Sequence, residues 1–233
     1  RLLRRLSAVY ADLLGEPTRA FAATRDAFAL APDDRDVLAE LAALAVRSGA
    51  TGELAQAIDE ALAGGAAQTT WTDLMLAKAR VLATVPASAS DAVAAFRSVL
   101  ERETDPSDVV MAVEGFQALV RAMSPGEERT AAVRWLHGWR VERGASDERA
   151  RLLGEWATAE ETELGDPAAA LAHCRRVLEI DPEDIDALGA VARLSFALGD
   201  VEGALEARIA RRGASEGEAR NALDVQIATI LVD

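Results

Sequence analysis

Apolar residues recur along the chain at spacings of three and four, which is the period of a helix with one buried face. Leu6, Val9, Tyr10 and Leu13 give one instance. All seven prolines fall between such segments, and neither strand alternation nor an Asn-Gly hairpin turn occurs. The pattern therefore predicts an all-α protein. The expected helices are 1–14, 17–30, 34–48, 51–63, 70–84, 89–102, 107–123, 126–142, 146–164, 167–179, 184–198, 201–212 and 216–232.

The prolines also indicate where helices begin. Pro17 and Pro167 follow Gly-acid pairs and suit the first turn of a helix, where a missing N–H costs nothing. Pro32, Pro106 and Pro182 lie in Ala-Pro or Asp-Pro turns. The acidic or serine residues after these three are expected to cap the next helix.

The chain repeats itself at a distance of 150 residues without a gap. Leu14-Gly15-Glu16-Pro17 returns as Leu164-Gly165-Asp166-Pro167. Self-similarity of this kind predicts a stack of small similar units. The matched pairs are Gly15/Gly165, Pro17/Pro167, Ala20/Ala170, Pro32/Pro182, Leu38/Leu188 and Gly49/Gly199.

The repeating unit resembles the tetratricopeptide repeat, a helix–turn–helix of 34 residues. Units of this length start at Arg1, Arg35, Arg151 and Ile185. Three kinds of position support the resemblance: glycines that end the first helix, alanines where the second helix packs closely, and prolines that close the unit. These are Gly15, Gly49, Gly165 and Gly199; Ala20, Ala170 and Ala204; and Pro32 and Pro182. The resemblance implies an α-solenoid of antiparallel helix pairs wound into a right-handed superhelix.

We expect one repeat array over 1–233, with about six helix pairs and one extra helix. The double units are about 1–72, 73–147 and 148–214, and the extra helix is 215–233. The stretch from about Gln68 to Gly144 fits loosely, so two-helix repeats of the HEAT type stay open for it. Asp105-Pro106 and Gly126-Glu127 match Ala31-Pro32 and Gly52-Glu53 at an offset of 74. Both ends carry apolar stripes, which predicts a fragment of a longer chain that could self-associate through uncapped ends.

Charge narrows the choice of partners. The 233 residues carry a net charge of −14, which repels phosphate backbones and anionic lipid, so neither nucleic acid nor membrane is the expected partner. No apolar run approaches the ~20 residues that span a bilayer, and no secretory signal is visible. The default expectation is therefore the cytoplasm. Lys78 is the only lysine, and this preference for arginine indicates a GC-rich bacterial source.

The sequence offers no catalytic, cofactor or metal motif. His137 has no ligand at helical neighbour spacing, and His173 and Cys174 are consecutive, so they point about 100° apart on a helix. The acidic run from Asp181 lacks the glycine of a calcium loop, and no nucleophile or phosphate-loop motif occurs. Arg211, in the pair Arg211-Arg212, is expected to be a helix-end or surface charge. An enzyme is therefore disfavoured, with no catalytic residue, cofactor or metal expected.

The resemblance implies that the first helices of successive pairs line a concave groove. Its candidate polar residues are Arg5, Asp12, Asp36, Arg47, Glu155, Glu163 and Arg193. The family's carboxylate clamp for chaperone tails needs lysine and asparagine, which the corresponding positions lack, so chaperone tails are disfavoured. Trp135 and Trp139, at i and i+4, are either core residues between repeats or exposed anchors for a partner.

The expected function is a non-catalytic protein-interaction scaffold that binds a peptide or partner surface in this groove. The identity of the partner does not follow from the sequence. The alternative is a regulatory or accessory module of a larger polypeptide whose catalytic or signalling domain lies outside these residues.

Overall fold

The computed structural model describes residues 1–65, 70–102 and 105–232, which form α-helices and no strand. The boundary expected near Gln68 and the end of the extra helix at Asp233 lie outside these residues. The helices are α1 (Leu2–Ala8), α2 (Pro17–Leu30), α3 (Arg35–Ser48), α4 (Thr51–Ala63), α5 (Trp71–Leu82), α6 (Ala89–Glu101), α7 (Pro106–Ala122), α8 (Glu127–Arg143), α9 (Arg149–Thr162), α10 (Pro167–Ile180), α11 (Ile185–Ala197), α12 (Val201–Ala214) and α13 (Gly217–Val232), with a π-helical turn η1 (Val9–Leu13) and a 3₁₀ turn η2 (Pro86–Ser88).

The predicted all-α fold is confirmed, and most helix ends fall within three residues of the expected ones. The first helix differs, because α1 changes into the π-helical turn at Val9, where the backbone widens by one residue per turn. The helix expected from Ser146 begins at Arg149.

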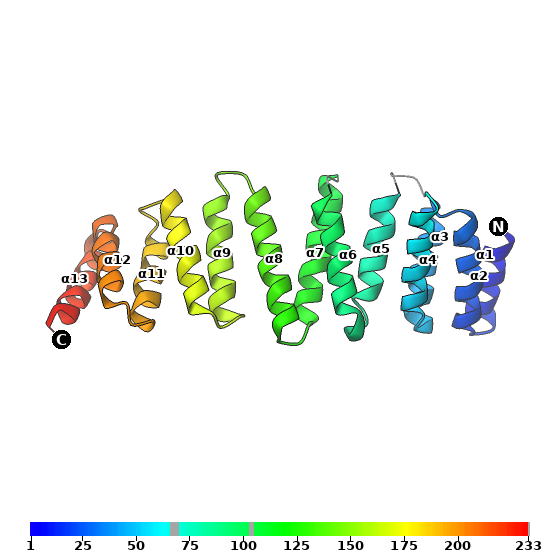
Figure 1. Cartoon of the computed structure of the whole chain (residues 1–233), viewed down its shortest axis with the longest axis horizontal. Coiled ribbons are helices and arrows are strands. Elements are labelled where there is room, and N and C mark those ends of the chain that lie inside the picture. The colour runs from blue at the N-terminus through cyan, green and yellow to red at the C-terminus, as the bar shows by residue number, and fades with distance from the viewer. Residues whose placement is uncertain (66–69, 103–104, 233) are drawn as a thin grey trace. The chain divides into compact units, whose positions relative to one another are not determined.

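The chain divides into two compact units, Arg1–Ala132 and Val133–Asp233. In the first unit, consecutive helices from α1 to α7 pack on one another, and the first helices α3 and α5 also touch. In the second unit, α9 packs on α10, α10 on α11, α11 on α12 and α12 on α13. The short connections make neighbouring helices antiparallel (Figure 1). Each unit is therefore built from antiparallel helix pairs.

The repeat of 150 residues is visible in the backbone at Gly15 and Gly165. Both have positive φ, 64° and 68°, a conformation that glycine adopts without a steric penalty. The amide after Gly15 donates to the carbonyl of Tyr10 at 2.8 Å, and the amide after Gly165 donates to that of Glu160 at 2.8 Å. The same turn, with a six-residue hydrogen bond, therefore closes both first helices.

A second glycine pair, also 150 residues apart, closes its helices in another way. Gly49 and Gly199 have φ of 73° and 84°. The next amide donates to the carbonyl five residues back, Ala45 in one case (3.0 Å) and Ser195 in the other (2.9 Å). The two kinds of turn thus alternate in the same order in both units, as the sequence match predicts.

Aspartates cap the helices that follow the turns. The carboxylates of Asp34 and Asp184 accept hydrogen bonds from backbone amides in the first turns of α3 and α11, as expected after Pro32 and Pro182. The expectation for Pro106 is wrong. There the cap is the preceding Asp105, which accepts from the amide of Ser107 at 2.8 Å, because α7 already begins at the proline.

The matches at offset 74 do not align the helices. In α3 the first helical residue comes three positions after Pro32, whereas Pro106 is itself the first residue of α7. Gly52 is the second residue of α4, whereas Gly126 precedes α8. These matches therefore reflect similar turn chemistry at different places in the repeat.

Small residues mark the closest helix contacts. Ala20, Ala170 and Ala204 are completely buried, as the repeat pattern predicts. In the loosely fitting centre, Ala92 of α6 has this position and is also completely buried. Gly115 of α7 marks a further close contact there, because a β-carbon would lie 2.7 Å from the ring of Phe96. That ring also stacks on Phe116, with centroids 5.9 Å apart. The centre of the chain thus keeps the buried alanine of the outer repeats and adds a contact between a glycine and two phenylalanines.

Candidate functional site

The seven polar groove candidates fall into two sets, five of them on first helices, with Asp12 in the π-helical turn η1 and Glu163 directly after α9. Arg5, Asp12, Asp36 and Arg47 are in the first unit, and Glu155, Glu163 and Arg193 are in the second. All are exposed except Glu155, which is half-buried. The structure brings neither set together into one site, and their role in binding stays a prediction.

Several of these candidates already make interactions that stabilise their own helices. Asp36 lies in the first turn of α3 and Arg47 in its last, where each charge is favourable to the helix dipole. Glu155 is held by Arg140 of α8 at 2.9 Å and by Arg151 of its own helix. Their charge alone is therefore weak evidence for a binding role.

Arg193 belongs to a series of ion pairs that join successive first helices. Each pair links residues 32 to 38 positions apart, about one repeat. Side chains in these pairs are partly exposed, so each contributes little to stability, about 0–1 kcal/mol. The pairs are Arg4 with Glu40 (3.3 Å), Arg35 with Asp73 (2.7 Å) and Arg193 with Glu161 (2.8 Å).

The second unit contains a buried acid, Glu160, that sequence reasoning missed. Its side chain is 1% exposed and accepts from Arg134 of α8 at 2.8–3.2 Å and from the indole of Trp156 at 3.0 Å. Arg134 also donates to Asp166, the cap of α10, at 2.7 Å. A buried carboxylate needs such partners, so this network fixes α8, α9 and the start of α10 to one another.

Both histidines stack on Trp156. His173 lies 3.9 Å from the indole and His137 6.2 Å, measured between ring centroids. Burial lowers the pKa of both histidines, and Arg140 and Arg176 lower it further at His137 and His173 respectively. Both histidines are half-buried and belong to the packing between α8, α9 and α10, so they are more enclosed than the expected surface or groove position suggests.

Trp135 and Trp139 are half-buried, so their exposure lies between that of core residues and that of exposed partner anchors, the two alternatives given above. Their rings stack with centroids 6.5 Å apart, and the guanidinium of Arg143 lies 5.8 Å from the ring of Trp139. They form an aromatic strip along α8, and their use as partner anchors stays a prediction.

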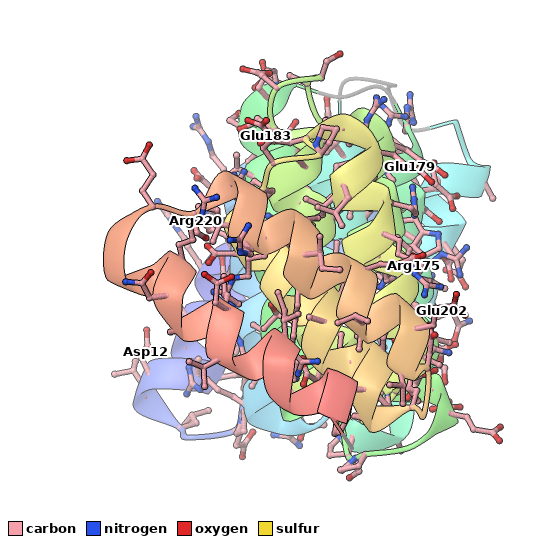
Figure 2. All side chains as sticks on the ribbon, turned by 90° about the vertical axis from the view of Figure 1, so that its left-hand side faces the viewer. Asp12, Arg175, Glu179, Glu183, Glu202 and Arg220 are labelled. Carbon is pink, nitrogen blue, oxygen red and sulfur yellow. The ribbon has the colours of Figure 1, made fainter. Side chains whose placement is uncertain are left out.

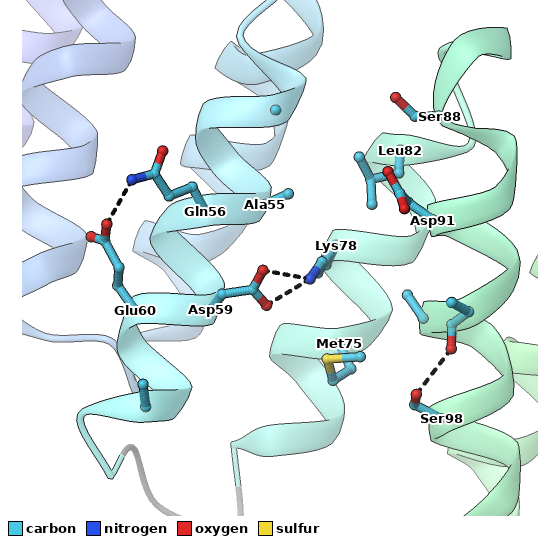
Figure 3. Close-up of a pocket in the computed structure, with 14 residues that line it drawn as sticks. Ala55, Gln56, Asp59, Glu60, Met75, Lys78, Leu82, Ser88, Asp91 and Ser98 are labelled. Carbon is cyan, nitrogen blue, oxygen red and sulfur yellow. Dashed lines mark hydrogen bonds and ion pairs between the residues drawn. The ribbon is translucent and has the colours of Figure 1, made fainter.

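The first unit has a groove of about 740 Å³ between the second helices α4 and α6, with α5 as its floor (Figure 3). Met75 and Leu82 of α5 supply apolar surface, and small residues of α4 and α6 leave the space open. In Figure 3, Lys78 points from α5 toward Asp59 of α4, and its ammonium nitrogen lies 2.6 Å from the carboxylate. Asp91 lies on the opposite wall.

The second unit has a pocket of about 480 Å³ on the side of the first helices. Arg193 and Asp186 of α11 form one wall, Leu223 of α13 another, and Arg208 and Arg211 of α12 the floor. The predicted candidate Arg193 therefore does line a cavity on the expected face.

The floor of this pocket decides between the two alternatives expected for Arg211, which lies in the last turn of α12. Arg211 is partly buried, and its guanidinium lies against the backbone of Gly189, where an added β-carbon would be 3.0 Å from Cζ. Arg211 is thus a helix-end charge, as one of the two expected alternatives has it, and its neighbour Arg212 pairs with Asp224. A glycine inside the predicted helix 184–198 was the available signal, because such a glycine often marks a close approach.

The second helices of the second unit present charged side chains. Arg175 and Glu179 of α10 and Glu202 of α12 point outward along one edge (Figure 2). Arg175 pairs with Asp200 at 3.2 Å.

Within the described part of the chain, no group of three or more His, Cys, Asp or Glu side chains could hold a metal ion. No helix among the same residues is both long and apolar enough to cross a bilayer. Cys174 is buried, and burial raises the pKa of its thiol, so it is protonated at neutral pH.

A family model of the tetratricopeptide repeat matches residues 161–207, from the end of α9 to α12. Among solved structures, the chain is similar to the TPR2AB-domain:pHSP90 complex of yeast Sti1 (16% identity, TM-score 0.38, 98% of this chain and 95% of that one). It is also similar to TTC0263, a thermophilic TPR protein of Thermus thermophilus (16%, 0.34, 99% and 98%). No curated protein matches it. The chain is an all-α helical-repeat protein that contains a tetratricopeptide repeat, and the resemblance read from its sequence is confirmed.

Proposed function

We propose that the protein is a non-catalytic interaction scaffold whose partner binds the face formed by the first helices. The observation that carries this is the pocket between α11 and α13, which opens on that face and is lined by Arg193. Repeat proteins of this kind present rigid surfaces, and a rigid surface lowers the entropy that binding costs.

Selection of a displayed random peptide library on the purified protein tests the proposal, followed by hydrogen exchange of the complex. We expect bound peptide to protect amides of α11 and α13, which form the walls of the pocket. Arg193→Ala should weaken binding about tenfold, the loss of a ~1.4 kcal/mol interface contact. Arg175→Ala is the matched control, since it removes an exposed, paired arginine from the second-helix side of the same unit.

A second surface for the same function is the groove between α4 and α6. Its walls carry Asp59, Glu60 and Asp91, and its only described cation, Lys78, is already paired. Charge complementarity therefore favours a partner segment with apolar residues and unpaired lysine or arginine. Ala94→Trp, at an exposed position on the wall, should block this groove without disturbing the core.

Peptide binding by the two variants distinguishes the two surfaces. Loss of peptide binding in Ala94→Trp with normal binding in Arg193→Ala would move the interaction to the α4–α6 groove. If no peptide is selected above the level of an unrelated helical protein, the scaffold function itself is contradicted.

A further inference from the structure

Two arginines at the floor of the α11–α13 pocket have donors without acceptors. Arg208 and Arg211 lie one turn apart on α12 and so face the same way. Nη1 of Arg208 and Nε of Arg211 are buried, and neither has a hydrogen-bond partner among the described residues. A charged donor that is buried without an acceptor destabilises the folded state. The pocket therefore favours an acceptor supplied from outside.

The charges that line the pocket favour an acceptor that is an anion. Its described ionisable residues are Arg193, Arg208, Arg211 and Asp186, three cations and one anion in a chain whose net charge is −14. Glu161 already balances Arg193. The other two guanidinium groups have no ion pair within the described part of the chain.

The pocket also has the shape for a polyatomic anion. Gly189 has no side chain, so the Arg211 guanidinium can approach the α11 backbone closely, and both residues line the cavity. Arg208 is fixed separately, with its guanidinium 5.6 Å from the ring of Phe196. Leu223, which is 5% exposed, shields one side from water and so strengthens electrostatic attraction inside.

We propose that this pocket is an oxyanion-binding site, in which Arg208 and Arg211 hold a phosphate or carboxylate group. Guanidinium groups match the planar, bidentate geometry of both anions. The site lies on the first-helix face, so the inference rests on the proposed function in one respect: a partner would present the anion there, unless it is free phosphate.

Titration with inorganic phosphate at constant ionic strength tests the site, read by NMR from the Nε–Hε signal of Arg211 and the amide of Gly189. We expect saturable shifts at both, and a rise in thermal midpoint with phosphate because the ligand binds the folded state. Arg211→Gln should weaken binding at least tenfold. Arg212→Gln is the control, since it removes the same charge one residue further on, from a side chain that is paired elsewhere.

Arg211→Met gives an independent readout. It removes an unpartnered buried charge, so without phosphate its thermal midpoint should equal or exceed that of the wild type, and it should no longer respond to phosphate. If Arg211→Gln does not fold, Arg208→Gln is read in the same titration. Shifts that do not saturate, or equal affinity in the Arg211 and Arg212 variants, would overturn the site in favour of diffuse ion attraction.

Two peptides of the same sequence, one with phosphoserine and one with glutamate, separate the sources of the anion. Binding of phosphate and of either peptide supports a contact with a partner. The peptide that binds then shows whether the partner's anion is a phosphate or a carboxylate. Binding of phosphate but of neither peptide supports a site for the free anion. Absence of saturable phosphate binding overturns the oxyanion site, and the peptide selection above then decides the scaffold function separately.

Discussion

Arg134 holds the buried carboxylate of Glu160 through both Nε and Nη2, at 2.9 and 2.8 Å, although the two residues lie on different helices. The carboxylate is almost completely shielded, whereas the arginine side chain is 41% exposed. The partly exposed guanidinium of Arg134 therefore neutralises the charge of the Glu160 carboxylate, which is buried away from water.

Arg134→Ala should destabilise the second unit by about 3 kcal/mol, because it leaves the Glu160 carboxylate buried without its main partner. Chemical denaturation followed by circular dichroism measures this. Arg175→Ala breaks an exposed pair and should cost less than about 1 kcal/mol. Equal effects of the two substitutions would mean that Glu160 is hydrated in solution.

Acidification should destabilise the protein between about pH 7 and pH 5, because the pKa of His137 and of His173 is lowered in the folded state. The unfolded chain then takes up protons first, near the ordinary histidine pKa of ~6.5, so stability is complete above that pH and falls as the pH drops through it. Arg140, Glu155, Glu160 and Glu163 act on His137, and Arg176, Glu160 and Arg134 on His173.

Denaturation midpoints at half-unit steps of pH measure this loss. The double variant His137→Phe, His173→Phe should have a flatter profile over the same window. The carboxylates of Glu161 and Asp166 do not interfere, because their pKa is lowered and they stay ionised there. An unchanged slope in the double variant would rule out the histidines as its source.

Ala170→Trp should lower stability by ~1–3 kcal/mol, since Ala170 is completely buried where α10 meets α9. Ala172→Trp places the same side chain at an exposed position of the same helix and should be nearly neutral. Thermal denaturation distinguishes them. A neutral Ala170→Trp would show that the repeat register assigned to this pair is wrong.

Gly165→Ala should cost roughly 1–2 kcal/mol, because its φ of 68° is strained for any residue with a β-carbon. Gly154→Ala should have the opposite sign and stabilise by about 1 kcal/mol, since Gly154 lies within α9 and nothing is within 4 Å of an added β-carbon. Urea midpoints measure both. The same sign for both would contradict the left-handed turn at Gly165.

The helices and their turns could be predicted because their signals are local. A glycine after an apolar segment and a proline at the next helix start fix Gly15 and Pro17, or Gly165 and Pro167, without knowledge of distant contacts. The turn before α7 was misplaced because Asp-Pro-Ser-Asp offers two caps, Asp105 and Ser107, and only the backbone decides between them.

The candidate site was predicted less well because its chemistry depends on neighbours from other helices. Glu160 reads as one more surface acid until Arg134, 26 residues earlier, is placed beside it. Arg211 is a helix-end charge, as expected, but its packing against Gly189 of α11 depends on a residue 22 positions earlier. Arg193 was a candidate because the resemblance to the tetratricopeptide repeat implies that its position lies on the first-helix face, and it does line a pocket.

The ion pairs between first helices have a consequence for the ancestry of the array. Arg35 finds its carboxylate, Asp73, on the next first helix, whereas Arg193 finds its own, Glu161, on the previous one. A recombinant in which α11 directly followed α3 would separate both arginines from their carboxylates. Because each exposed pair contributes only about 0–1 kcal/mol, duplicated helix pairs with similar turns differ slightly in which neighbour suits them best.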